Sequence, residues 1–311
     1  MSSFLLLLVQ VSFVLAQNDE TKERPLAYIP NKIAAIVAGS IYMFTAGASA
    51  LWLFRHWGRY MLAIIIGSAC YAAGLYLRIV YANDPDNVMK YATMNLIILL
   101  SPCAFIAGVY MLLSCLAIHL DATDLLLVPH RLLTKVFVIS DVVTFLAQAA
   151  GGGMTAGDNA NMQNVGKKIF LGGLIAQLIS FLGYTVVFGV FVWRMRTQRN
   201  DDWSSRPHGI LRHWLALAAA MALSCQNIIV RSVFRVAENA QGRHGVLAGN
   251  EQYFYMMDCA VLWVAVSVFL VIWPPRYLTG YKPAGTGREL ESEVKLIAPE
   301  RYEMPHYSGR I

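Results

Sequence analysis

Seven long apolar runs limit the folds open to this chain more than any other feature of its sequence. They cover about residues 31–54, 60–82, 91–118, 132–151, 168–193, 213–237 and 253–273. A run of roughly 20 apolar residues is long enough for a helix to cross the hydrocarbon core of a bilayer. Lipid offers the backbone no hydrogen-bond partners, and the alternating pattern of a membrane β-barrel is absent. We therefore predict an all-α membrane protein, a bundle of seven transmembrane helices.

The composition supports a polytopic membrane protein and argues against a soluble domain. Of the 311 residues, 57% are hydrophobic and only 14% are charged, and the mean hydropathy is +0.50. The net charge of +6 does not indicate nucleic-acid binding, because the basic residues lie in the short gaps between apolar runs. We therefore expect membrane lipids, and no nucleic acid, among the partners of the chain.

The distribution of lysine and arginine over the gaps predicts the orientation of the bundle. The gaps after the first, third and fifth runs are rich in basic residues, and the gap 194–212 alone contains five arginines. The alternate gaps contain few. Because cytosolic loops carry the excess of basic residues, we predict the N-terminus outside and the C-terminus in the cytosol.

The two ends of the chain are predicted to lie outside the bundle. An apolar core of about 12 residues precedes the polar segment QNDETKER, and Val14 and Ala16 suit cleavage before Gln17, as in a signal peptide. The alternative is an uncleaved extension, because a charged start is missing. We expect a signal peptide at 1–16, an extracellular segment at 17–30, the seven-helix transmembrane domain at 31–275 and a disordered cytosolic tail at 276–311.

Polar and ionisable side chains recur at helical spacing inside the apolar runs. In the sixth and seventh runs, steps of three or four residues separate Asn227, Arg231, Arg235, Glu238 and, after the intervening gap, Glu251, Tyr255 and Asp258. Side chains at such steps share one face of a helix. Arg231 and Asp258 each lie seven residues from the predicted outer end of their helix, which is about 10 Å of depth. We therefore predict that they pair.

Three further runs place polar side chains in the same predicted half of the membrane, namely Arg78, Asp141, Gln148 and Gln177. A charged side chain at the bilayer centre costs about 2.5–3.5 kcal/mol on insertion scales, so such residues must pair or face a water-filled interior. We expect these faces to line a shared cavity open to the outside, where they bind the substrate of a transporter. The alternative is that the polar residues only hold the helices together.

Several segments are similar to one known family. They are LLSPCAFIAGVYM (99–111), SDVVTFLAQAAGGGM (140–154), GKKIFLGGLIAQLISF (166–181), VRSVFRVAENAQG (230–242) and NEQYFYMMD (250–258). They resemble the fungal lipid-translocating exporter family, also called RTA-like. The resemblance implies a fungal seven-helix protein of the plasma membrane that exports amphipathic lipids such as sphingoid long-chain bases, sterol-like toxic compounds or, in one branch, porphyrins. The resemblance also implies that the family's polar positions correspond here to Asp141, Gln148, Gln177, Arg231, Arg235, Glu238, Gln241, Glu251 and Asp258.

Two functions other than lipid export are considered for a seven-helix chain, a receptor or sensor and an intramembrane enzyme. A seven-helix receptor or stress sensor, which binds a lipid without moving it, remains an alternative, because the basic loop 194–213 could dock a cytosolic partner. We expect no enzyme, no cofactor and no metal site: His119 alone is too few ligands for a metal-dependent hydrolase, and the seventh run has no lysine for a retinal Schiff base. No GxxxxGK[ST] motif for ATP occurs. The sequence is compatible with a homo-oligomer.

Epitope tags in intact cells test the predicted orientation. We expect a C-terminal tag to bind antibody only after permeabilisation, because the basic gaps place the tail in the cytosol. A tag inserted just after Gln17 should be accessible without permeabilisation. A C-terminal tag that is accessible in intact cells would reverse the arrangement.

Overall fold

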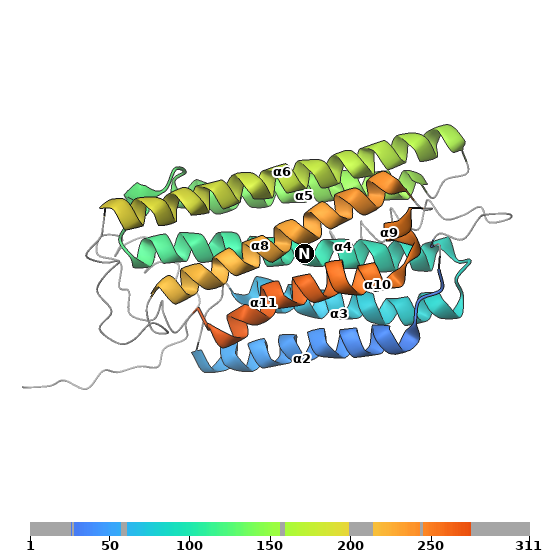
Figure 1. Cartoon of the computed structure of the whole chain (residues 1–311), viewed down its shortest axis with the longest axis horizontal. Helices are drawn as coiled ribbons and strands as arrows, with labels where there is room; N and C mark the ends of the chain where they lie inside the picture. Colours follow the sequence, from blue (N-terminus) through green and yellow to red (C-terminus); the bar gives the residue numbers. More distant parts are fainter. Residues whose placement is uncertain are drawn as a thin grey trace, which may run out of the picture. The chain divides into compact units, whose positions relative to one another are not determined.

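The computed structural model describes residues 26, 28–56, 61–155, 159–198, 214–242 and 245–274. The predicted signal peptide and cytosolic tail, and most of the predicted extracellular segment, lie outside the described residues. Within these ranges every regular element is helical (Figure 1). In chain order the elements are α2 (Lys32–His56), α3 (Leu62–Asn83), α4 (Val88–His119), the short 3₁₀ turn η2 (Thr123–Leu125), α5 (His130–Thr155), α6 (Ala160–Gln198), α8 (Trp214–Gln241), α9 (Val246–Gly249), α10 (Glu251–Tyr253), the π-helix η4 (Phe254–Ala260) and α11 (Val261–Val271).

The predicted bundle of seven membrane-spanning helices is confirmed. Seven helical stretches in the described residues are long and apolar enough to cross a bilayer, the seventh being continuous from Glu251 to Val271. Helix α6, with 39 residues, extends well beyond the predicted run 168–193, whereas α4, with 32 residues, exceeds the run 91–118 by four. Helix α4 begins early because the Asn87 side chain accepts hydrogen bonds from the first backbone N–H groups, at Met89 and Lys90.

The helices are arranged around α4. It packs against α3, α5, α6 and α8, while α2 packs against α3 and α11. Successive long helices run in opposite directions, so α2 begins and α11 ends at opposite ends of the bundle (Figure 1). We call the end at which α2 begins, and at which α10 lies, the Glu251 end. It is the end predicted from the charge distribution to face outside.

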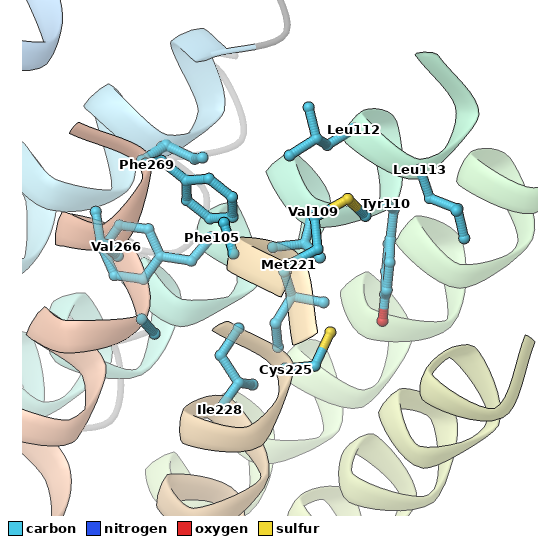
Figure 2. Close-up of a cluster of buried hydrophobic side chains, with 14 of the residues drawn as sticks. Phe105, Val109, Tyr110, Leu112, Leu113, Met221, Cys225, Ile228, Val266 and Phe269 are labelled. Carbon is cyan, nitrogen blue, oxygen red and sulfur yellow. The ribbon is translucent and has the colours of Figure 1, made fainter. Parts of the chain in front are cut away.

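The core lies where α4, α8 and α11 meet. Figure 2 shows Phe105 and Val109 of α4 together with Met221 of α8 and Phe269 of α11, all of them buried. The outward faces carry large exposed apolar side chains, such as Phe44 on α2. A soluble monomer rarely exposes apolar surface to this extent, but the surface suits contact with lipid tails.

Glycines let α5 and α6 approach more closely than larger residues would. The run Gly151–Gly153 does not end the fourth span, as the predicted limit at 151 implied, because α5 continues to Thr155. A Cβ atom on Gly151 would lie 2.6 Å from the backbone nitrogen of Phe170 and 2.7 Å from the carbonyl oxygen of Gly166. Small residues at such crossings are typical of membrane helix pairs, where close van der Waals contact drives association.

The seventh span departs from regular α-helix. The π-helix Phe254–Ala260 lies between α10 and α11, and its wider turn contains the buried residue Asp258. The hydroxyl of Tyr42 on α2 donates a hydrogen bond to the carbonyl of Cys259, at 2.8 Å. Short π segments are rare and occur frequently at functional sites.

The close α5–α6 contact predicts a position-specific effect of adding one methyl group. We expect Gly151→Ala to destabilise the protein by about 1–3 kcal/mol, because the new atom meets backbone rather than a movable side chain. Gly172→Ala is the matched control, since nothing lies within 4 Å of its Cβ position. Thermal unfolding in detergent measures both. Equal melting temperatures for the two variants would contradict the close approach.

Candidate functional site

A fully buried carboxylate, that of Asp258, lies at the centre of the charged residues. Arg235 of α8 donates to both of its oxygens, with Nε 3.0 Å from Oδ1 and Nη2 2.8 Å from Oδ2. The hydroxyl of Tyr71 on α3 donates to Oδ2 at 2.8 Å. The two-pronged contact is the geometry in which a guanidinium binds a carboxylate most strongly. Asp258 thus joins three membrane helices.

The pairing of Arg231 with Asp258 that residue depth predicts is confirmed, but it is not the principal contact. Arg231 Nε lies 2.7 Å from Asp258 Oδ1, and both side chains are buried. The Nε–H is not aligned with the carboxylate, so the contact is an ion pair without a good hydrogen bond, and Nη2 has no acceptor among the described residues. Arg235, one turn further along α8, makes the stronger contact.

A second group of contacts lies at the Glu251 end. Arg78 of α3 donates to Glu251 at 3.1 Å and to the Tyr28 hydroxyl at 3.0 Å. Both Glu251 oxygens also accept from the backbone N–H of Asn31, at 3.1 and 2.9 Å, just before α2 begins. A carboxylate is favourable there because the N-terminus of a helix carries partial positive charge. Glu251 therefore ties the start of α10 to α2 and α3.

The ring of Phe254 connects the two groups. The guanidinium of Arg78 lies 4.1 Å from its centroid and that of Arg235 lies 5.4 Å from it. Arg235 also donates to Glu238 at 3.1 Å. We call the joined set the ion network; its members are Arg78, Arg231, Arg235, Glu238, Glu251 and Asp258. With three arginines and three carboxylates, its formal charges balance.

A separate polar layer joins α4, α5 and α6. Each helix contributes two polar residues seven positions apart, and the members are Cys103, Tyr110, Asp141, Gln148, Gln177 and Tyr184. Nearer the Glu251 end, the Gln148 amide donates to Gln177 Oε1 at 2.8 Å, and Gln177 donates to Cys103 Sγ at 3.4 Å. A Cβ on Gly173 would lie 2.8 Å from Gln148 Cγ, so this glycine makes room for the amide pair.

The other level of the polar layer lies about 10 Å deeper, because seven residues separate the levels along each helix. Here the Tyr184 hydroxyl donates to the carbonyl of Val109 at 2.9 Å, and the rings of Tyr110 and Tyr184 lie 4.4 Å apart. Asp141 belongs to this level. It is 3% exposed, and neither carboxylate oxygen has a hydrogen-bond partner in the described part of the chain.

The predicted site residues thus fall into two sets rather than one. Asn227 belongs to neither, because its amide donates to the Leu223 carbonyl of its own helix at 2.8 Å. The Tyr255 ring lies 5.6 Å from the Arg78 guanidinium, beside the ion network. Tyr71 and Tyr110 were not predicted, although the spacing of Cys103 and Tyr110 repeats that of Asp141 and Gln148.

The described residues contain no group of three or more His, Cys, Asp or Glu side chains that could hold a metal ion. The side chains of the two sets can form ion pairs and hydrogen bonds and can exchange protons. Carboxylates and arginines can bind charged head groups of either sign, whereas an unpaired carboxyl can hold a proton.

Comparison with known proteins decides the family. The sequence profile of the family described as "RTA1 like protein" matches residues 64–281, which is more than half of the chain and includes every predicted site residue. The chain belongs to the RTA1 like protein family. The resemblance to the fungal lipid-translocating exporters is thereby confirmed.

Three relatives of this RTA1 like protein come from Saccharomyces cerevisiae. Protein RTA1 is 29% identical over 71% of this chain and 69% of its own length, and protoporphyrin uptake protein 1 is 28% identical over 64% of each chain. The sphingoid long-chain base transporter RSB1 is 25% identical over 73% of this chain and 65% of its own length. These matches thus span about two thirds of each relative. No solved structure matches the protein significantly.

The geometry around Asp258 predicts an order of effects in this RTA1 like protein. Removing a partner from a buried ion pair costs about 3–5 kcal/mol, because a charge is left uncompensated. We expect Asp258→Asn to be the most destabilising change, followed by Arg235→Gln and then Arg231→Gln. The last change costs least because the Nε–H of Arg231 is poorly aligned with the carboxylate. The exchange Arg231→Asp with Asp258→Arg should recover less stability than a simple pair would, since Arg235 then faces a new arginine.

Melting temperatures in detergent and a double-mutant cycle measure these effects. Asn227→Ala is the matched control on α8, because its side chain bonds only within its own helix. We expect coupling between residues 231 and 258 to exceed about 0.5 kcal/mol, the usual limit for independent sites. Strict additivity, or an equal loss in the control, would contradict the assigned contacts.

Proposed function

We propose that this protein exports amphipathic lipids with a cationic head group, such as sphingoid long-chain bases, and sterol-like toxic compounds. The observation that carries the proposal is the ion network, a balanced set of arginines and carboxylates inside a seven-helix membrane bundle. Charged residues inside membrane bundles usually mark substrate or ion pathways. The cargo class is supported by the relative named as a sphingoid long-chain base transporter.

The carboxylates of the ion network differ in how accessible they are. The side chains of Glu238 and Glu251 are 17% and 19% exposed, whereas Asp258 is completely buried and held by two arginines. A carboxylate at an exposed edge can exchange its arginine partner for the ammonium group of a cargo lipid. We therefore assign head-group binding to Glu238 and Glu251, and the support of the fold to Asp258.

The proposal extends to orientation and location. The Glu251 end faces outside and the tail is cytosolic, in agreement with the distribution of basic residues between the runs. The plasma membrane is the location that the resemblance to the lipid exporters implies. Cargo then leaves the cell at the end where Glu238 and Glu251 are accessible. The half-buried ring of Tyr255, beside Arg78, provides a surface for a cationic head group there.

A porphyrin is the second cargo that a specific observation favours. One relative is named protoporphyrin uptake protein 1. A porphyrin carries carboxylates, which would bind the arginines of the ion network rather than its glutamates. The sign of the charge that the site prefers therefore separates the two cargo classes.

Flux across liposomes tests the proposed function. We expect the purified protein to speed the transfer of a labelled long-chain base between leaflets, relative to empty liposomes. Glu238→Gln should weaken apparent cargo affinity about 10- to 150-fold, because a hydrogen bond to a charged group contributes roughly 1.5–3 kcal/mol. Labelled protoporphyrin, tested in parallel, would instead be affected by Arg78→Gln.

Asp84→Asn is the matched control for the glutamate variant. Asp84 is an exposed carboxylate just after α3, at the Glu251 end, and it pairs with Lys90 at 2.9 Å. We expect its replacement to leave flux unchanged, since exposed ion pairs contribute little. Binding of the labelled base without any flux would favour the receptor or sensor instead, and neither binding nor flux would contradict both functions.

A further inference from the structure

Asp141 differs from the other buried charged residues of the described ranges. Those residues are Arg78, Asp141, Arg231, Arg235 and Asp258, and all except Asp141 take part in ion pairs. Asp141 lies near the middle of α5, which places it near mid-depth in the membrane. Its two oxygens are buried and have no hydrogen-bond donor among the residues that the structure describes.

Among the described residues, no element packed around Asp141 supplies a counter-charge. Helix α4 contributes Tyr110, whose hydroxyl approaches the carboxyl but is neutral, and Cys103, which lies further toward the Glu251 end. Helix α6 contributes Tyr184, whose hydroxyl is already donated to a backbone carbonyl. On α8, Arg231 is paired with Asp258.

An ionised carboxylate in these surroundings would be unfavourable, because burial removes its hydration and nothing replaces it. A buried acid without a partner is neutralised instead by binding a proton. We propose that Asp141 carries an exchangeable proton at mid-depth and is the proton-coupling site of this protein. Use of that proton to drive cargo rests on the proposed function, whereas proton binding itself does not.

The polar layer indicates the side from which the proton comes. Gln148 and Gln177 lie about 10 Å from Asp141 toward the Glu251 end, and Gln148 Oε1 is buried without a donor. These amides can solvate a proton between the aqueous phase and Asp141. The step is a simple transfer: the carboxylate takes one proton from water on one side and later releases it to water, with no oxidation or reduction.

Infrared spectroscopy of the purified protein tests proton binding without any cargo. At neutral pH we expect a carbonyl stretching band of a neutral carboxylic acid in the wild type and its loss in Asp141→Asn, which has nearly the same shape. Asp84→Asn is the control and should leave the band unchanged. The hydrogen bond from Lys90 lowers the pKa of the Asp84 carboxyl, so that group is already ionised at neutral pH.

Exchange into D₂O tests whether the proton can move. We expect the band assigned to Asp141 to shift to the frequency of the deuterated acid while the protein stays folded. Asp141→Glu, which keeps a carboxyl and should move the band to a slightly different frequency, makes the same assignment if Asp141→Asn fails to fold. Absence of the band in the wild type, or a band that does not shift in D₂O, would overturn the proposal.

Liposome flux then links the proton to transport. We expect an imposed pH gradient to speed cargo transfer by the wild type, and Asp141→Asn to lose this acceleration. A shifting infrared band together with no cargo flux would contradict the proposed function and leave proton binding supported. Cargo flux that ignores the gradient in the wild type would overturn the coupling role of Asp141.

Discussion

The neutralisation of the Asp258 carboxylate by two arginines is the interaction on which the ion-bearing half of the bundle depends. Lipid tails are as apolar as leucine, so burying apolar surface gives these helices little reason to associate inside a membrane. An unpaired charge facing lipid is unfavourable, so separating α8 from the π-helical part of the seventh span would cost free energy. The ion pairs of Arg231 and Arg235 with Asp258 therefore hold these two segments together. The hydroxyl of Tyr71 extends the same constraint to α3.

Other helix pairs are held by shape rather than by charge. The α5–α6 contact depends on backbone approaching backbone at Gly151 and Gly166, and α3 meets α4 where a Cβ on Gly74 would lie 2.6 Å from Ile98 Cγ1. Helix α4 is central because it makes both apolar and polar contacts. Its apolar side chains pack in the core with α8, and its polar side chains join α5 and α6.

In this RTA1 like protein two buried aspartates, Asp258 and Asp141, differ in whether their carboxylates are compensated by neighbouring groups. Asp258 receives an ion pair, a two-pronged guanidinium contact and a tyrosine hydrogen bond, whereas Asp141 receives none of these. A compensated carboxylate is rigid and suits a structural role. An uncompensated carboxylate changes its protonation state when its surroundings change, and this suits a role in coupling.

The sequence by itself determined the class of protein, the number of spans and the depth at which Arg231 and Asp258 lie, because run length and residue count act locally along each helix. It also placed Asn227 on the polar face, yet the amide bonds to its own helix. Only the tertiary structure decided that Arg235 is the main partner of Asp258, and that Asp141 meets no counter-charge within the described ranges. The rotation of each helix and the wider turn of the π-helix set which side chains meet. Helix rotation and the π-helical turn depend on packing between helices. The spacing of residues along a single helix does not specify that packing.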